Sequence, residues 1–396
     1  MTNESGESAG FMTAAIAPTQ KTERINILDI LRGYALFLIL IGNFQTIRVP
    51  WFTPGYEIPP LSPIDDLARI IMYNTLGTEL YLVFSFLFGL GFAVQISRAQ
   101  AKGVKGNALF IRRMLGLFIV GCLHYLLIWD GDILRVYAVF GIVLLLLNML
   151  SDRALWVGAV VLLVISPVAT RLLYNVDFGI AYPDNVLEQI NAVYYNQRSY
   201  LEVVAYRVNN FTPDFLAAVI FDGLNVLAMF MLGMYAGRRR IFENMAAYRP
   251  LFVWGLIIGI VGAIGGELLS IAIIHRPGMA LIHVSWITLL AQLPQWNKRL
   301  SILIPFGQMS FTNYIMQSII ATTLFYGYGF GLSDEMGAMG SLLVSIGIGI
   351  AQIAFSYWWM SRFNFGPLEW VWRSLSYGKF QSMRKVPEDK PATAPV

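Results

Sequence analysis

Ten long apolar runs separated by short polar loops dominate this chain of 396 residues. A helix needs roughly 20 apolar residues to cross about 30 Å of hydrocarbon, and the runs have about that length. Only 13% of the residues are charged, whereas soluble domains carry roughly 25%. The mean hydropathy is +0.60. A water-soluble core cannot hide so much apolar surface, so most of the chain must lie in lipid.

The runs predict an all-α polytopic membrane protein with about ten transmembrane helices in a single domain over residues 23–382. The flanking residues 1–22 and 383–396 are polar and aperiodic, and we expect disordered tails there. The predicted spans cover residues 27–47, 76–96, 109–128, 132–150, 153–173, 214–236, 251–274, 277–293, 301–325 and 337–360. The eighth span is the shortest, and a re-entrant segment there would reverse the sidedness of the last two spans.

The distribution of Lys and Arg predicts the orientation of these spans. With both termini on the cytoplasmic side, 20 of the 28 Lys and Arg residues fall in inside segments and seven fall outside, and Arg32 lies within the first span. This bias is what the positive-inside rule expects. The isoelectric point near 9.0 could also suggest a protein that binds nucleic acid. We reject that interpretation because the basic residues are spread over short loops rather than gathered in one stripe.

The longest predicted external segment covers residues 174–213. Its part at about 184–211 has two amphipathic stretches that we expect to form helices on the outer surface or over a cavity. In the seventh span, the pairs Gly255/Gly259 and Gly262/Gly266 are four residues apart, a spacing that favours close helix packing. The sequence shows no internal repeat and no clearly broken pair of helices, which transporters often have.

Several classes of site lack support in the sequence. Cys122 is the only cysteine, so an intrachain disulfide and a cysteine-rich metal cluster are excluded. No metal is expected, because the histidines and carboxylates match no standard zinc spacing. The chain has no nucleotide-binding loop, no dinucleotide fingerprint and no serine-hydrolase elbow.

Ionisable groups inside a membrane are costly and often functional. In the predicted topology, most of them lie in the outer half of the membrane, together with all three histidines of the chain. They predict a polar cavity at or just beneath the outer face, and the alternative is that several are hydrated interfacial groups. The candidates for substrate binding are Asn43, Glu79, Arg135, Asp222, Glu267 and His283.

The segment from His124 to Leu134 places a histidine close to Asp130 and Asp132. A carboxylate can orient an imidazole and raise its basicity, which makes His124, Asp130 and Asp132 the candidate catalytic residues. Two alternatives stay open. Asp132 can pair with Arg135 on the same helix face, and an Asp before an apolar run can cap the next helix.

Two further polar features lie in other spans. Asp29 and Arg32 share one face of the first span, where they form either an anchoring salt bridge or part of a cytoplasmic donor site. Residues 308–314 are unusually polar for a span, and such residues hydrogen-bond between helices or line a pathway.

Four segments resemble the YeiB family of bacterial inner-membrane proteins. They are Leu28 to Leu36 followed by Asn43, Leu123-His124 to Leu134, Phe306 to Tyr314, and Gly366-Pro367-Leu368-Glu369-Trp370-Val371-Trp372-Arg373, and they occur in that order. The first segment is also similar to that of the transmembrane acyltransferase superfamily. That superfamily includes surface-polysaccharide O-acyltransferases and the heparan acetyltransferase. The surface-polysaccharide enzymes have a histidine near the outer end of the first span, where this chain has Asn43. The heparan enzyme has its histidine in the following loop, and residues 48–75 of this chain contain none.

The resemblance implies a multi-pass protein of the bacterial inner membrane that carries an acyl group from cytoplasmic acyl-CoA to an envelope glycan or lipid. His124 is then the expected general base, Asp132 or Asp130 orients it, and Asp29 and Arg32 lie near the donor. Two alternatives are a transporter or flippase, with Asp222, Glu267 and His283 as a relay, and a non-catalytic sensor or scaffold. Membrane lipids are the expected partners, and a homodimer stays open.

Overall fold

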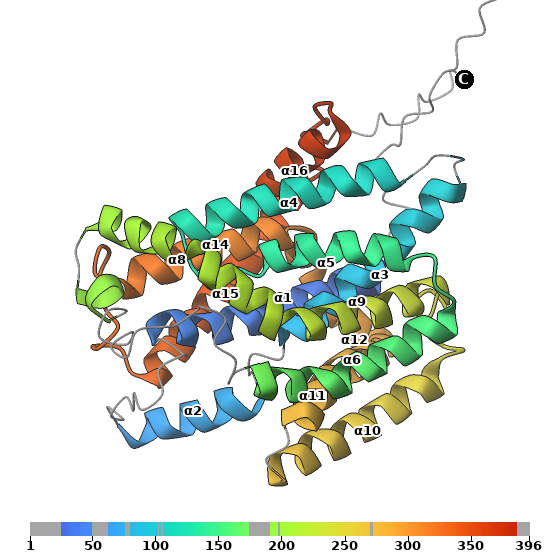
Figure 1. Cartoon of the computed structure of the whole chain (residues 1–396), viewed down its shortest axis with the longest axis horizontal. Coiled ribbons are helices and arrows are strands. Elements are labelled where there is room, and N and C mark those ends of the chain that lie inside the picture. The colour runs from blue at the N-terminus through green and yellow to red at the C-terminus, as the bar shows by residue number, and fades with distance from the viewer. Residues whose placement is uncertain are drawn as a thin grey trace, which may run out of the picture.

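The computed structural model describes residues 25–49, 62–75, 80–101, 103, 106–173, 191–196, 199–269 and 272–385. These residues form a bundle of helices that run roughly along one axis (Figure 1). In chain order the first helices are α1 (Asn26–Arg48), α2 (Pro63–Thr75), α3 (Leu80–Ala101), α4 (Asn107–Leu127), α5 (Leu134–Leu147), α6 (Asp152–Leu173) and the π-helix η2 (Asn191–Asn196). They are followed by α8 (Tyr200–Phe221), α9 (Gly223–Arg238), α10 (Arg249–Leu268), α11 (Ala272–Ala291), α12 (Pro294–Leu300), α13 (Leu303–Gln308), α14 (Ser310–Phe325), α15 (Ala338–Arg362) and α16 (Pro367–Tyr377).

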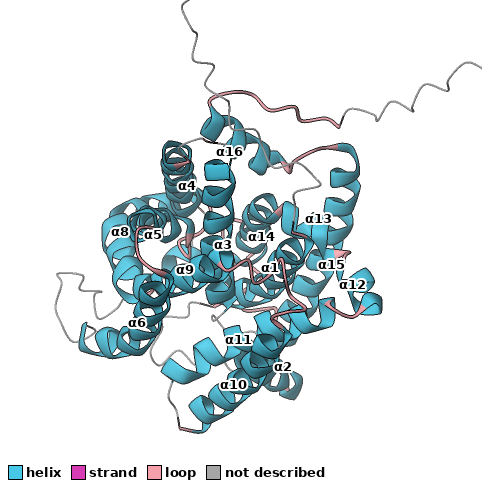
Figure 2. Ribbon diagram, turned by 90° about the vertical axis from the view of Figure 1, so that its right-hand side faces the viewer, coloured by secondary structure: helices cyan, strands magenta, loops and turns pink. Residues whose placement is uncertain are grey.

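The bundle is built around α1, which Figure 2 shows end-on among α3, α13, α14 and α15. Apolar residues cover most of its circumference, as expected of a helix surrounded by protein. Two glycines permit its closest contact, because a Cβ on Gly33 or Gly307 would collide with the backbone of the facing segment. This contact brings α13 against the first turns of α1.

The structure confirms an all-α membrane protein. Five helices are long and apolar enough to cross a membrane, namely α1, α3, α4, α10 and α15, and the bent pair α8 and α9 makes a sixth if it forms one span. These counts concern the described residues only, and they do not confirm the predicted number of ten. The predicted spans nevertheless all coincide with helices or with pairs of helices.

The sixth predicted span, residues 214–236, differs most from expectation. It is divided between α8 and α9, which meet at Asp222 with a bend of 51°. Gly223 follows the bend, and its Cα packs so closely against the ring of Phe140 that a side chain would collide there. The expectation that the chain contains no broken helix pair was therefore wrong.

The predicted outer amphipathic segment is partly described. Residues 191–196 form η2, and α8 begins at Tyr200, so its first half is the second predicted amphipathic stretch. This half exposes Leu201 and Val208 and buries Val203 and Arg207. It continues directly into the bent span instead of ending as a separate surface helix. Residues 184–190 and 197–198 of the predicted segment lie outside the described residues.

The glycines of α10 pack as the sequence predicts. Gly255, Gly259, Gly262 and Gly266 all face α11, where added Cβ atoms would meet side chains or backbone. The opposite face of α10 exposes large apolar side chains such as Trp254 and Val261. The hairpin of α10 and α11 lies at one edge of the bundle (Figure 2).

The C-terminal segment contains structure that the sequence did not predict. Residues 383–385, expected to be part of a disordered tail, pair with residues 362–364 through backbone hydrogen bonds and one antiparallel bridge. The rest of that predicted tail, like residues 1–22, lies outside the described residues.

Candidate functional site

The turn between α4 and α5 brings His124 and Asp132 together. The Nδ1 atom of His124 lies 2.9 Å from Oδ2 of Asp132, and the two side chains are 1% and 0% exposed. Because the turn contains only residues 128–133, the chain returns directly beside the last turn of α4. An ionised carboxylate only accepts hydrogen bonds, so Nδ1 carries the proton and Nε2 of a neutral imidazole keeps its lone pair. This is the arrangement of a general base.

The same carboxylate holds the start of α5. Oδ1 of Asp132 accepts the backbone N–H of Arg135 at 3.0 Å and its Nε–H at 3.3 Å. The pairing with Arg135 and the capping interaction are therefore present together with the histidine bond. Asp132 has two roles, since it orients His124 and stabilises the first turn of α5.

Aromatic rings lie beside the imidazole of the dyad. Nε2 of His124 is buried and has no hydrogen-bond partner among the described residues. The ring of Tyr314 lies 5.2 Å from the imidazole, centroid to centroid, and that of Trp129 lies 6.4 Å away. A buried nitrogen without a partner is costly in a purely structural histidine, which makes Nε2 the reactive atom to consider.

Asp130, the third candidate catalytic residue, does not join this dyad. Its Oδ2 accepts a hydrogen bond of 3.2 Å from the hydroxyl of Tyr194 on η2. Arg135 is also bound more tightly than a substrate-binding residue would be. Its guanidinium stacks 3.9 Å from the ring centroid of Tyr125, and only its Nη1 is buried without a partner.

A cavity of about 350 Å³ lies between the first turns of α1, the second half of α3, the first half of α4, the start of α14, and α16. Its lining combines aromatic and apolar side chains of α3 and α4 with charged groups. Four arginines and two carboxylates line it, namely Arg32, Arg98, Arg113, Arg373, Asp29 and Glu369. The cavity therefore suits an anionic ligand that also has an apolar part.

Asp29 and Arg32 meet in the wall of this cavity. The Nη1 atom of Arg32 lies 2.7 Å from Oδ1 of Asp29, whose Oδ2 accepts a bond of 3.1 Å from the side-chain amide of Gln308. The structure thus shows the predicted salt bridge and places both residues in the lining of the cavity. Arg113 bonds to Gln95, and its guanidinium lies 4.5 Å from the ring centroid of Trp372.

The amphipathic helix α16 closes one side of the cavity through Glu369. This buried carboxylate accepts the backbone N–H groups of Phe311 and Thr312 at 2.7 and 3.1 Å and the Thr312 hydroxyl at 2.5 Å. It therefore caps the N-terminus of α14 from another helix. Burial raises the pKa of the Glu369 carboxyl above its ordinary value, although these hydrogen bonds lower it in part.

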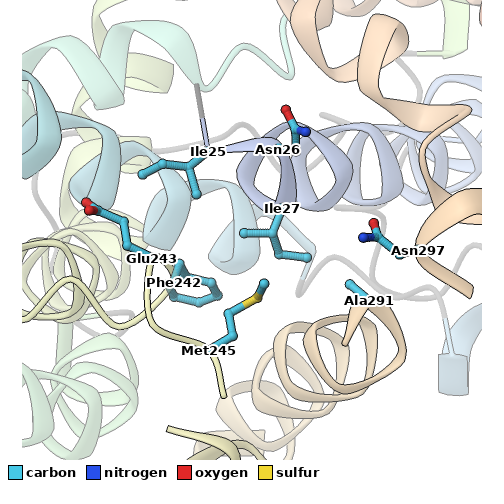
Figure 3. A pocket seen from close by; sticks show the side chains of 8 residues that line it. All are labelled: Ile25, Asn26, Ile27, Phe242, Glu243, Met245, Ala291 and Asn297. Carbon is cyan, nitrogen blue, oxygen red and sulfur yellow. The ribbon is translucent and has the colours of Figure 1, made fainter. Parts of the chain in front are cut away.

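A second pocket of about 300 Å³ lies near the start of α1 but contains none of the predicted site residues. The apolar side chains of Ile27, Phe242 and Met245 gather in it, and Asn26, Glu243 and Asn297 stand around its edge (Figure 3). Glu243 already pairs with Arg240. We do not place the function there.

The remaining predicted substrate-binding residues do not gather into one site. Nδ1 of His283 lies 2.6 Å from the hydroxyl of Tyr34, which also accepts a bond from Trp286. Glu267 is half-exposed and lies 3.6 Å from His275 in the α10–α11 hairpin.

Asp222 is located at the bend between α8 and α9, with Arg276 as an electrostatic neighbour. Asn43 is half-buried on α1 and takes no part in the bonds of the dyad. Glu79 lies outside the described residues. The predicted polar outer cavity is therefore represented by separate small clusters.

Some residues of the site were not singled out from the sequence. Tyr314, Arg113, Arg373 and Glu369 all border the cavity or the dyad. Tyr314 belongs to the polar run 308–314, and Glu369 and Arg373 belong to the C-terminal segment that resembles the YeiB family. The arginines were counted only as loop charges, because their meeting depends on the tertiary structure.

The fold and these sites define a helical membrane protein with a buried His–Asp dyad and a basic cavity. A family model described as "Protein of unknown function (DUF418)" matches residues 236–379. The uncharacterized protein YxaH of Bacillus subtilis (strain 168) is 31% identical over 94% of this chain and 99% of YxaH. The uncharacterized protein YeiB of Escherichia coli (strain K12) is 25% identical over 89% of this chain and 96% of YeiB. The chain belongs to this family, which confirms the resemblance to YeiB.

Proposed function

We propose that this protein is an acyltransferase of the bacterial inner membrane, which moves an acyl group from a cytoplasmic acyl-CoA to a hydroxyl of an envelope glycan or lipid. The observation that carries the proposal is that helix α14 connects the cavity to the dyad. Ser310, its first residue, lines the cavity, and Tyr314, one turn further, lies against His124. We therefore place the reactive end of a donor bound in the cavity beside α14, on the side of the cavity nearest the dyad.

The cavity has the charge and the location that a coenzyme A donor requires. In the predicted topology it opens at the cytoplasmic end, because it is lined by the start of α1, the end of α3 and the start of α4. The phosphates of coenzyme A carry several negative charges, which arginines bind well. The aromatic and apolar lining offers a surface for the pantetheine arm and the acyl chain.

The chemistry follows from the free Nε2 of His124. Nε2 takes the proton of the acceptor hydroxyl as its oxygen attacks the thioester carbonyl carbon. The C–S bond then breaks, and the imidazolium returns the proton to the leaving thiolate, so that an ester and free coenzyme A result. Asp132 stabilises the transient imidazolium through Nδ1.

Binding of coenzyme A to the purified protein tests the donor site. We expect Arg113→Gln and Arg373→Gln to weaken binding at least tenfold in calorimetric titrations. Arg240→Gln is the matched control, because Arg240 is an exposed arginine that pairs with Glu243 in a loop away from the cavity. Equal affinities in all of these variants would show that the cavity is not the donor site.

The chemical step is tested in cells. A strain that carries His124→Ala should lack an acyl ester in its glycan or lipid fraction that mass spectrometry detects in the wild-type strain. Glu267→Gln, a half-exposed site outside the dyad, should retain the ester. An unchanged ester profile with His124→Ala would refute the assignment of His124.

One observation favours the second candidate, a transporter. The bend at Asp222 interrupts a span with a carboxylate, and broken helices with polar groups form the binding sites of many transporters. Asp222→Asn should then abolish accumulation of the cargo in cells while His124→Ala preserves it. The enzyme proposal predicts the opposite pattern for ester formation.

A further inference from the structure

Arg207 on α8 is fully buried, with 0% exposure, and among the described residues it interacts with Tyr194, Tyr326 and Asp130 but makes no hydrogen bond of good geometry. Its Nε, Nη1 and Nη2 atoms all lack a hydrogen-bond partner there. A guanidinium has five N–H donors, and leaving them unpaired inside a protein is costly. Such a group is readily explained if a ligand supplies the missing acceptors.

Tyr194, Tyr326 and Asp130 lie around the Arg207 guanidinium, and these four residues are called the Arg207 box. The ring centroids of Tyr194 and Tyr326 lie 5.3 and 5.8 Å from its guanidinium carbon. Asp130 acts on it electrostatically, but Oδ2 of Asp130 is already bonded to the Tyr194 hydroxyl. Asp130 thus offsets the charge of Arg207 without accepting its hydrogen bonds.

This box lies beside the dyad on its predicted outer side. Trp129 contacts the ring of His124 and packs in the same apolar cluster as Tyr194 and Tyr326. Arg207 is therefore on the side from which an acceptor in the outer half of the membrane would approach. Arg135, the arginine expected to bind the acceptor, is instead held by Asp132.

We propose that Arg207 binds a phosphate group of the acceptor. The planar fork of a guanidinium matches a tetrahedral oxyanion with two parallel hydrogen bonds. The phosphate can come from a lipid headgroup or from a soluble phosphate ester. This proposal rests on the proposed function only in treating the ligand as the acceptor.

One residue of the Arg207 box, Tyr194, belongs to a short irregular helix. Tyr194, one of the rings over the guanidinium, belongs to the six-residue π-helix η2, and π-helical turns occur often at functional sites. The outer face of α8 beside it is apolar, with Leu201 75% exposed and Val208 55% exposed. A lipid headgroup could thus reach Arg207 from the membrane when Tyr194 moves aside.

The test is a binding titration with two probes of different origin, dihexanoyl phosphatidylglycerol and glycerol 3-phosphate. The full chain is held in nanodiscs of neutral lipid at constant ionic strength, and the fluorescence of Trp129 and the other tryptophans is followed. All proteins carry Arg113→Gln and Arg373→Gln, so that the cationic cavity does not bind the probes. We expect saturation by at least one probe and an at least tenfold higher Kd with Arg207→Met.

A stability measurement separates binding from a structural role. Because the N–H groups of Arg207 make no hydrogen bond of good geometry among the described residues, Arg207→Met should melt at the same temperature as the parent or higher. Arg135→Met is the matched control and should melt lower, since Arg135 bonds to Asp132. Arg207→Lys retains the charge but loses the fork, and it should also bind more weakly with an unchanged midpoint.

The outcomes distinguish the sources and the proposals. Saturation by the lipid alone identifies a headgroup, and saturation by glycerol 3-phosphate identifies a soluble ester. Equal affinity of the parent and the Arg207 variants, saturation by neither probe, or a lower midpoint in both Arg207→Met and Arg207→Lys would overturn the proposal. If the chain that retains Arg113 and Arg373 does not bind coenzyme A, the proposed function is refuted. The result for phosphate binding at Arg207 would still stand.

Discussion

Asp132→Asn is the change for which the structure predicts the largest loss of stability. Asp132 accepts the Nδ1–H of His124 on one oxygen and two N–H groups of Arg135 on the other. An asparagine has only one side-chain acceptor oxygen, so either His124 or Arg135 must lose its partner. The guanidinium of Arg135, 1% exposed, is then buried without a counter-charge.

Removing one partner of a buried ion pair costs about 3–5 kcal/mol, and we expect Asp132→Asn to lower the free energy of unfolding by that amount. The chain offers a matched control in Asp66→Asn, because Asp66 and Arg69 are also an acidic–basic pair three residues apart. Their side chains are 51% and 36% exposed, so this change should cost about 1 kcal/mol or less.

The assay is unfolding in mixed micelles with increasing dodecyl sulfate, followed by the fluorescence of the ten tryptophans. The double variant Asp132→Asn/Arg135→Met should be more stable than Asp132→Asn alone, since it removes the unpaired charge as well. Equal losses for Asp132→Asn and Asp66→Asn, or no recovery in the double variant, would refute the reasoning about burial.

Three further predictions concern other parts of the structure. Burial raises the pKa of Glu369, so the folded state holds the carboxyl proton more strongly than the unfolded state. Stability should therefore fall as pH rises from the ordinary carboxyl pKa through the folded pKa. Unfolding curves of Glu369→Gln at several pH values should lack this dependence. Gly307→Ala should destabilise by about 1–3 kcal/mol because its Cβ would collide with the backbone of α1, whereas Gly265→Ala, which meets nothing, should not destabilise. Tyr34→Phe and His283→Phe should be coupled by about 0.6 kcal/mol in a double-mutant cycle, because their side chains bond at 2.6 Å; additive effects would argue against that bond.

The spans were predictable because a single local property determines them. Residues 27–47 and 337–360 were predicted as spans, and the helices long and apolar enough to cross a membrane there are Asn26–Arg48 and Ala338–Arg362. The bend at Asp222 was not predicted, since the apolar run continues through it, and the close contact of Gly223 with the ring of Phe140 is visible only in the tertiary structure. Helices α2 and α16 are short and amphipathic, and hydropathy alone does not detect such elements.

The same distinction applies to the site. His124 and Asp132 are eight residues apart across a tight turn, so their proximity could be predicted from the sequence alone. The box around Arg207 combines η2, α8 and the end of α14, which are far apart in the chain. Sequence reasoning therefore assigned acceptor binding to Arg135, the arginine adjacent to the dyad, and did not single out Arg207.

The four segments that resemble the YeiB family meet around one cavity and one dyad. Asp29 and Arg32 from the first, Gln308 from the third, and Glu369 with Arg373 from the fourth all line the cavity. The second supplies the dyad, and the third reaches it through the tyrosine that contacts the imidazole. A polar group in a membrane protein is stable only when another polar group or a ligand satisfies it. Since these segments span most of the chain, residues far apart in the sequence meet at the cavity and beside the dyad.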